Sequence, residues 1–181
     1  MSTAESQRPF DGRVAIIVMG VAGSGKSTVG EALSQALGAP FIDGDDLHSP
    51  AARAKMAQGI ALDDADRRPW LDCIGAAIAD EARYPRGVVV ACSALRGIYR
   101  DQLRARVGPR LRFLFLQGDK ALMRERIARR KGHYMPVSLI DSQFAALETP
   151  EAEPDVVTMP ANANIGNALP AIIRDLSMLR I

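Results

Sequence analysis

Near its start the chain carries the glycine-rich segment Gly20-Val-Ala-Gly-Ser-Gly-Lys-Ser27, directly after an apolar run over residues 14–19. The segment matches G-x-x-x-x-G-K-[ST], a pattern that functions between a buried strand and a helix. Its glycines let backbone N–H groups turn inward, and the following helix presents its positive end, so both attract phosphate oxygens. The preceding run is rich in β-branched residues, as is typical of a parallel strand buried on both faces. The sequence therefore predicts an α/β protein with a nucleotide-phosphate site after its first strand.

Each part of this segment has an expected task. Lys26 reaches the terminal phosphates, and the hydroxyl of Ser27 holds Mg²⁺. The predicted nucleotide-binding residues are Gly20, Val21, Ala22, Gly23, Ser24, Gly25, Lys26, Ser27 and Thr28. The alternative is a glycine-rich turn with an incidental lysine, and the strand and helix patterns on either side argue against it.

Short apolar runs alternate with helical patterns along the chain. The predicted strands cover residues 14–19, 41–42, 87–92, 111–116 and 156–159. The predicted helices cover residues 27–37, 51–58, 98–107, 120–130, 136–147 and 165–179, and another begins at Pro69, where a missing N–H costs little. This alternation predicts a parallel sheet between two layers of helices, a three-layer α/β/α sandwich. We expect one domain over residues 1–181, with a flexible N-terminus at 1–11.

Charge and composition argue against several classes of protein. The 23 cationic and 21 anionic residues give a net charge of +2, and 5% of residues are aromatic, whereas nucleic-acid binders usually carry a basic excess or stacking platforms. No apolar run approaches the about 18 residues that span a bilayer, and the polar N-terminus does not resemble a secretory signal. Cys73 and Cys92 form no C-x-x-C pair, which favours a reducing compartment. We expect a cytoplasmic protein that binds neither nucleic acid nor membrane.

A phosphate loop alone does not distinguish a kinase from a GTPase or a motor ATPase. The guanine-reading N-K-x-D pattern is absent, and the strand at 87–92 ends in Cys-Ser instead of the aspartate that large ATPases use for Mg²⁺. The nearest acids are Asp43, Asp45 and Asp46, which follow the second strand at the edge where ligands bind parallel sheets. A carboxylate there can orient a substrate hydroxyl and accept its proton. The alternative is a solvated turn with local Asx bonds.

Two basic clusters are further candidates. The first consists of Arg124, Arg126, Arg129, Arg130 and Lys131, followed by Gly132-His133. It suits either a lid whose arginines close over a phosphoryl group or a solvated helix face. The second, Arg67 and Arg68, stands just before the helix expected at Pro69, where cations oppose the helix dipole unless an anion is near. Surface ion pairs with the adjacent aspartates are the alternative there.

Taken together, these segments resemble the P-loop gluconokinases of bacteria and fungi. The resemblance runs from Val14 to about Pro150 and includes, besides the phosphate loop, Asp-Gly-Asp-Asp-Leu-His (43–48), Asp-Arg-Arg-Pro-Trp-Leu (66–71), Cys-Ser-Ala-Leu (92–95), Lys-Gly-His-Tyr-Met (131–135) and Ser-Gln-Phe (142–144). Members of that family resemble shikimate and adenylate kinases in fold and transfer the γ-phosphate of ATP to the 6-hydroxyl of D-gluconate. The resemblance implies the strand order 2-3-1-4-5, ATP and Mg²⁺ as cofactors, and a homodimer.

The resemblance also implies roles for individual residues. Asp45 contacts the acceptor hydroxyl and Asp43 acts in the water shell of Mg²⁺. An acceptor-binding insert covers about residues 47–68, and the implied substrate contacts are Asp45, His48, Arg67, Arg96 and His133. Arg126 and Arg130 clamp phosphates beside a lid at about residues 131–140. The implied catalytic residues are Lys26, Asp45, Arg126 and Arg130.

The chain departs from the usual family pattern at Ser49, Ala52 and Ala61, and it has Arg96 where a lysine is usual. These positions fall where the acceptor pocket is expected. A P-loop kinase of shikimate or nucleoside type is therefore an alternative, and so is a nucleotide-sensing or nucleic-acid-associated P-loop protein that has no acceptor.

Overall fold

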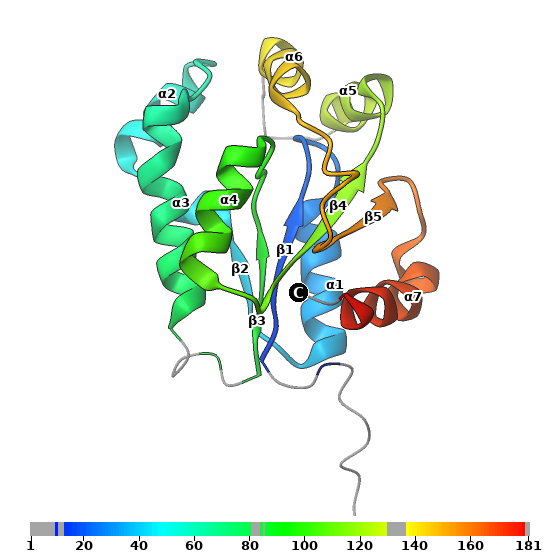
Figure 1. Ribbon diagram of the computed structural model, residues 1–181. Helices are drawn as coiled ribbons and strands as arrows, with labels where there is room; N and C mark the ends of the chain where they lie inside the picture. Colours follow the sequence, from blue (N-terminus) through cyan, green and yellow to red (C-terminus); the bar gives the residue numbers. More distant parts are fainter. Residues whose placement is uncertain (1–9, 11–12, 81–83, 85, 130–136, 180–181) are drawn as a thin grey trace, which may run out of the picture.

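Five parallel strands form one sheet in the order β2-β3-β1-β4-β5, which confirms the expected order. The structure is a computed structural model, and it describes residues 10, 13–80, 84, 86–129 and 137–179. The strands are β1 (Ala15–Met19), β2 (Phe41–Asp43), β3 (Val88–Ala91), β4 (Leu111–Gln117) and β5 (Val156–Pro160). The central strand β1 is buried along its length, and its Ile17 pairs with Val90 of β3 and Phe113 of β4. The carboxyl ends of the strands therefore meet at one edge of the sheet (Figure 1).

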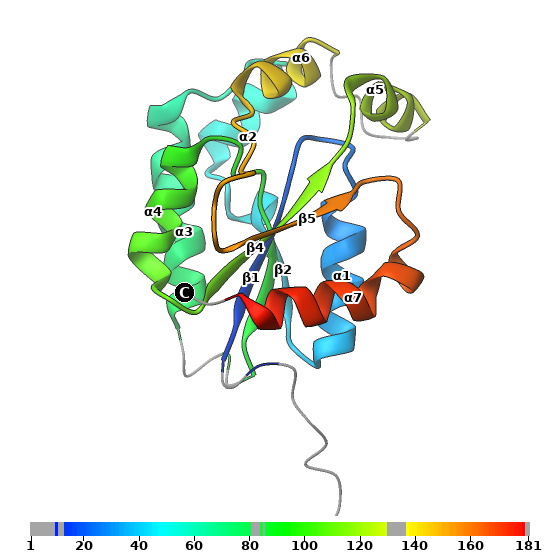
Figure 2. The same cartoon turned by 45° about the vertical axis from the view of Figure 1, so that its right-hand side comes forward.

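Helices cover both faces of the sheet, as the alternation predicts (Figure 2). The covering helices are α1 (Lys26–Leu37) and α7 (Ile165–Met178) on one face, and α3 (Asp64–Ala79) and α4 (Gly97–Val107) on the other. Successive residues of β1 divide between two hydrophobic cores because side chains alternate along a strand. Ile16 packs in the core that contains Leu33 of α1, whereas Ile17 packs in the core that contains Ile74 of α3.

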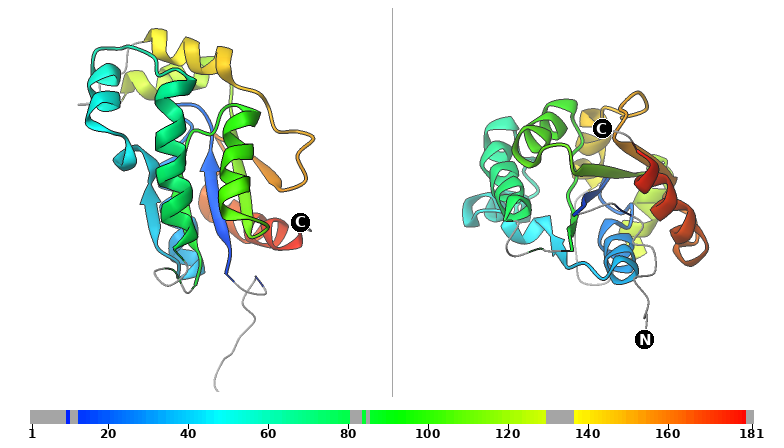
Figure 3. Two further views of the ribbon diagram at one scale, coloured as in Figure 1. Left: turned by 60° about the vertical axis from the view of Figure 1, so that its left-hand side comes forward. Right: turned by 60° about the horizontal axis from the view of Figure 1, so that its bottom comes forward.

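Three more helices lie beyond the carboxyl edge of the sheet rather than on a face (Figure 1 and left view of Figure 3). They are α2 (Pro50–Ala57), α5 (Lys120–Arg129) and α6 (Val137–Ala146). A short 3₁₀ turn, η1 (Gly44–Leu47), leads from β2 toward α2. These segments therefore surround the edge at which the phosphate loop lies.

Within the described ranges, no helix is both long enough and apolar enough to cross a bilayer.

The predicted start of α3 is wrong, because the helix begins at Asp64 and contains Pro69 in its interior. The side chain of Asp63 accepts from the N–H of Asp66 at 2.8 Å, and the side chain of Asp66 accepts from the N–H of Asp63 at 3.2 Å. This capping box satisfies N-terminal amides and starts the helix earlier. Pro69 lies on the exposed side, where the carbonyl that it leaves without a donor can bond to water. Arg67 therefore lies within the helix, and the prediction that it and its neighbour oppose the dipole from before the helix is wrong.

A cluster of ion pairs joins α4 to the segment before β5. Arg100 is 1% exposed, and its Nε lies 2.9 Å from Oε2 of Glu153. Its Nη1 donates to the carbonyl oxygen of Ala94 at 2.9 Å, in the loop after β3. Arg104 bonds to Glu153 as well, and its Nε lies 2.7 Å from Oδ2 of Asp155. The cluster therefore fixes both the approach to β5 and the loop that leads from β3 into α4.

We expect the Glu153→Gln variant to lose about 3 kcal/mol of unfolding free energy at neutral pH, because the buried Arg100 then lacks its counter-charge. Burial raises the pKa of Glu153, but the bonds from Arg100 and Arg104 outweigh it, so the net pKa is lowered from 4.5. A carboxyl group whose pKa is lower in the folded chain than in the unfolded chain stabilises the folded state at pH values above its unfolded pKa. This stabilisation is lost as the pH falls through the folded pKa. Urea unfolding should therefore show a large difference in unfolding free energy between the variant and the unaltered chain at neutral pH. The difference should be smaller well below pH 4.5.

The matched control for this variant is Glu151→Gln, which changes an exposed residue of the same segment. We expect the control to unfold like the unaltered chain at every pH. Equal unfolding free energies for Glu153→Gln and the unaltered chain at neutral pH would contradict the role given to this cluster.

Candidate active site

The loop between β1 and α1 has the backbone that its glycines allow. Gly20, Gly23 and Gly25 have φ angles of 144°, 82° and 95°, in the region that residues with side chains rarely adopt. A Cβ atom on Gly20 would lie 2.9 Å from Oγ of Ser24 and 3.0 Å from the carbonyl oxygen of Leu116, so nothing larger fits there. The loop passes directly into the N-terminus of α1, the arrangement that binds phosphate oxygens.

Lys26 and Ser27 open α1 and are both held at this loop. Nζ of Lys26 donates to the carbonyl oxygen of Val21 at 3.1 Å. Oγ of Ser27 donates to Oδ2 of Asp43 at 3.0 Å. Ser24 is buried, and its Oγ has no hydrogen-bond partner among the described residues, whereas Thr28 is exposed. An ammonium and a hydroxyl thus lie at the rim of the same loop.

Asp43 and Asp45 lie at the end of β2, across from the phosphate loop. Asp43 is the last residue of the strand, and while its Oδ2 accepts from Ser27, its Oδ1 accepts from the N–H of Asp45 at 3.1 Å. Its carboxylate therefore caps η1 and connects that turn to α1. The side chain of Asp45 is 78% exposed, so its carboxylate is open to a ligand.

His48 lies beneath the turn that carries Asp45. Its ring stacks on Trp70 with centroids 4.2 Å apart, and Nε1 of Trp70 donates to the carbonyl oxygen of Gly44 at 2.7 Å. Burial lowers the pKa of His48 and outweighs the opposite effect of Asp45, whose Oδ1 lies 3.9 Å from Nε2 of the imidazole. The ring is therefore neutral at neutral pH, and it supports the acidic turn from below.

Cys92 directly follows β3 at the carboxyl edge of the sheet and is buried. Burial raises the pKa of its thiol to about 12, so the group stays protonated and unreactive. The backbone N–H of Cys92 donates to the carbonyl oxygen of Val18 in β1 at 3.1 Å, so this residue lies beside the strand that leads into the phosphate loop.

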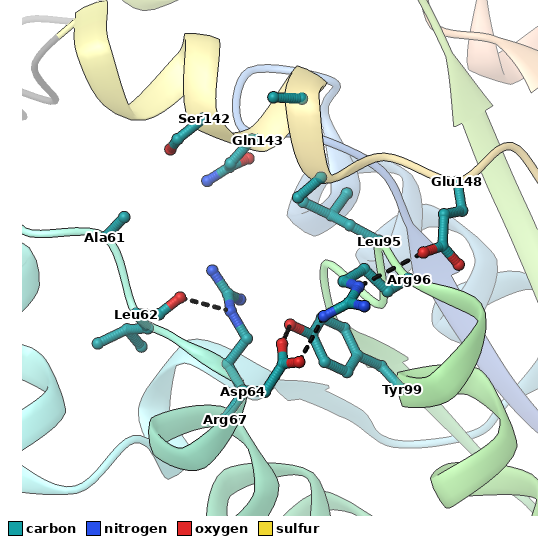
Figure 4. Close-up of a pocket in the computed structure, with 12 residues that line it drawn as sticks. Ala61, Leu62, Asp64, Arg67, Leu95, Arg96, Tyr99, Ser142, Gln143 and Glu148 are labelled. Atoms are coloured by element: carbon teal, nitrogen blue, oxygen red, sulfur yellow. Dashed lines mark hydrogen bonds and ion pairs between the residues drawn. The ribbon is translucent and has the colours of Figure 1, made fainter.

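A cavity of about 560 Å³ opens beside the acidic turn (Figure 4). Its walls come from the segment that precedes and begins α3, the loop after β3, and α6. Arg67 and Arg96 line it together, although Arg67 comes from α3 and Arg96 from the residue that caps α4. Asp45 and His48 are not among its lining residues. The helix α3 connects the two regions, because it contains both Arg67, which lines the cavity, and Trp70, which stacks on His48.

The two guanidinium groups in the cavity have different partners. Arg96 forms ion pairs with Asp64 and, at 3.4 Å, with Glu148. Tyr99 and Arg96 both donate to Asp64 and lower the pKa of its carboxyl group. Arg67 instead donates from Nε to the carbonyl oxygen of Leu62 at 3.2 Å and lies over the ring of Tyr99, and no carboxylate among the described residues pairs with it. Arg67 therefore has a positive charge available for an anionic ligand.

The basic residues of α5 divide between two environments. Arg126 reaches back to the phosphate loop, where its Nη1 lies 3.4 Å from the carbonyl oxygens of Gly23 and Ser24, and its Nη2 donates to Ala161 at 2.9 Å. Arg124 pairs with Asp141 of α6 and Arg129 with Glu125 of its own helix, as a solvated face would. The described residues do not include Arg130, His133 or most of the lid expected at residues 131–140. They resume at Val137, where α6 begins.

Five polar residues of the cavity have no role predicted from the sequence. They are Asp64, Tyr99, Ser142, Gln143 and Glu148. Gln143 belongs to the Ser-Gln-Phe segment on which part of the family resemblance rests, and Glu148 follows it closely. The sequence therefore marked this region but did not indicate a role for either residue. Of the positions that depart from the family pattern, Ala61 and Arg96 line this cavity, whereas Ser49 and Ala52 line a separate one of about 310 Å³ beside α2.

The chain is similar to several known proteins. A family model described as an AAA domain matches residues 16–150. The chain is 45% identical over 152 residues to the thermosensitive gluconokinase of Escherichia coli K12, covering 83% of this chain and 81% of the relative. It is 39% identical over 159 residues to a gluconokinase of Gluconobacter oxydans, covering 88% and 89% of the two chains.

Solved structures give the same result. The crystal structure of a gluconokinase from Sinorhizobium meliloti superposes with a TM-score of 0.83 at 43% identity, covering 92% of this chain and 93% of that one. A shikimate kinase from Aquifex aeolicus has a TM-score of 0.60 at 19% identity, covering 90% and 96%, and shares the fold.

Proposed function

The chain belongs to the gluconokinase family of P-loop kinases, and on that premise we propose that it transfers the γ-phosphate of ATP to the 6-hydroxyl of D-gluconate. The products are 6-phosphogluconate and ADP. The observation that carries the proposal is the hydrogen bond between Ser27 and Asp43, which joins the phosphate loop to the acidic turn that contains Asp45. A phosphate-binding ammonium, a carboxylate that can bind a hydroxyl, and the guanidinium of Arg67, with which no described carboxylate pairs, are what a sugar-acid kinase needs.

ATP binds with its phosphates in the loop over residues 20–25 and its terminal phosphates at Lys26. The fixed N–H groups and the ammonium stabilise the charge on the transferring phosphoryl group, which is the main task in a loose transition state. Arg126, already against the loop carbonyls, adds a second cation from α5. Arg130, four positions later in the sequence, is proposed to join it.

The residues at the loop fit the Mg²⁺ that such a reaction uses. Mg²⁺ prefers oxygen ligands and takes few from the protein, retaining water and phosphate oxygens. Oγ of Ser27 would supply one such oxygen, and Oδ2 of Asp43, which lies 3.0 Å from it, would bind a water molecule of the metal's shell. When bound, the metal neutralises charge on the nucleotide phosphates. The two side chains hold each other in place for this role.

The acceptor lies in the cavity with its carboxylate at Arg67, since a planar guanidinium binds a carboxylate through two parallel hydrogen bonds. Arg96, which Asp64 and Glu148 already hold, is proposed as a further contact to the acceptor. Asp45 binds the hydroxyl that is phosphorylated and accepts its proton as the bond to phosphorus forms. Because transfer is largely dissociative, the proton leaves late and an ordinary carboxylate suffices. His48 holds this acidic turn from beneath, and His133 is proposed to contact the acceptor from the lid.

We further propose that the enzyme acts as a homodimer in the cytoplasm. Cys73 and Cys92 are both free thiols, as a reducing compartment allows. Light scattering coupled to size-exclusion chromatography measures the assembly directly.

An acceptor panel tests the proposed reaction. Release of ADP is measured with gluconate, other sugar acids, shikimate, nucleosides and no acceptor, in the presence of ATP and Mg²⁺. We expect the highest kcat/KM with gluconate and far slower ADP release without an acceptor. A higher kcat/KM with shikimate or a nucleoside would assign the chain to another kinase type, and acceptor-independent hydrolysis would assign it to the nucleotide-sensing class.

A further inference from the structure

Gln143 of α6 is tied to the phosphate loop by a single hydrogen bond. Its Oε1 accepts from the backbone N–H of Ala22 at 2.7 Å, across 121 positions of sequence. A backbone N–H can only donate, so this bond determines which end of the side-chain amide faces the loop. The carbonyl oxygen faces Ala22, and the NH₂ group must point the other way.

The NH₂ group of Gln143 points into the acceptor cavity. Gln143 lines that cavity, and Figure 4 shows its nitrogen turned inward on the side of Arg67. No hydrogen bond from this nitrogen is formed within the part of the chain that the structure describes, whereas Arg96 across the cavity is held by two carboxylates. The NH₂ group of Gln143 and the guanidinium of Arg67, with which no carboxylate of the described residues pairs, therefore both face the same space.

We propose that Gln143 donates a hydrogen bond to a hydroxyl of the bound sugar acid and thereby positions it against the phosphate loop. The inference rests on the proposed function, since it needs a polyhydroxylated acceptor in this cavity. A neutral amide suits a hydroxyl oxygen, while the guanidinium groups suit the carboxylate. Because the same side chain is hydrogen-bonded to Ala22, it would fix the position of the acceptor relative to the backbone that binds the phosphates. Holding two reacting groups in the correct geometry in this way contributes to catalysis.

Replacing Gln143 by methionine removes both the donor and the acceptor while keeping the length of the side chain. We expect KM for gluconate to rise about tenfold, the scale of one lost hydrogen bond, with the KM for ATP little changed. Gln102→Met is the matched control, because the amide of Gln102 donates to Arg68 and Asp72 on the surface, away from the cavity. The control should have the kinetics of the unaltered enzyme.

A set of deoxygluconates, each lacking one hydroxyl, identifies the contact. If Gln143 binds one hydroxyl, Gln143→Met costs about tenfold with every analogue except the one lacking that hydroxyl, for which the two enzymes become equal. A merely structural tie between α6 and the loop would give the same loss with every analogue, and that result would overturn the inference. So would tighter ATP binding with an unchanged KM for gluconate, which would mean that Gln143 competes with phosphate for the N–H of Ala22.

The two proposals fail in different ways. If the unaltered chain does not phosphorylate gluconate, the proposed function fails. If it does, and Gln143→Met acts on gluconate like the unaltered enzyme, only the inference on Gln143 fails.

Discussion

The Lys26→Ala variant is expected to lose kcat by roughly 10³-fold or more while remaining folded, because it removes the cation that we propose binds the transferring phosphoryl group. The fold should survive, since Nζ of Lys26 makes a hydrogen bond to Val21 that is only partly buried. The KM for gluconate should change little, because the ammonium serves the nucleotide end of the site. Steady-state ADP release at saturating substrates measures the effect, and circular dichroism checks the fold.

Lys120→Ala is the control for this experiment. Lys120 pairs with Asp141 at 2.8 Å on the outer side of α5 and α6, so the variant removes the same charge away from the phosphate loop. We expect it to keep nearly full activity. A loss of less than about tenfold in purified Lys26→Ala would contradict the role given to Lys26 in charge stabilisation.

Asp45→Asn is expected to lower kcat by roughly 10²- to 10⁴-fold, the usual contribution of a positioned proton acceptor. The amide keeps the size of the side chain but can no longer accept a proton. Because the carboxylate of Asp45 is 78% exposed and the turn is capped by Asp43 instead, stability should not change. ATP binding, measured by calorimetry without acceptor, should also be unaffected.

The neighbouring Asp46→Asn variant provides the comparison, since Asp46 is also exposed in η1 but supplies only its backbone carbonyl to Arg53. We expect Asp46→Asn to resemble the unaltered enzyme. If both aspartate variants lost activity equally, the general acidity of the turn would matter and the specific role of Asp45 would be withdrawn.

Local patterns predicted the parts of the molecule that depend on neighbouring residues in the chain. The alternation of Ile16 and Ile17 between two cores follows from a strand buried on both faces, and the positive φ of Gly20 follows from the phosphate-loop pattern. The early start of α3 was also local, because Asp63 and Asp66 form its capping box, but the proline at 69 gave a stronger signal and led to the wrong boundary.

The acceptor cavity could not be derived in this way. Arg67 and Arg96 were singled out from the sequence. That Asp64 pairs with Arg96, while no carboxylate of the described residues pairs with Arg67, depends on how α3 and α4 pack. The bond between Gln143 and Ala22 joins residues 121 positions apart, and no spacing along the chain indicates it.

By itself, then, the sequence determined the phosphate loop, the layers of the sheet and the acids that follow β2, because each depends on backbone preferences and burial within a short segment. Only the tertiary structure decided which of the charged and amide side chains share a cavity and which are already paired. Those pairings arise where α3, the loop after β3 and α6 meet at the carboxyl edge of the sheet, and contacts between distant segments are set by packing rather than by local propensity.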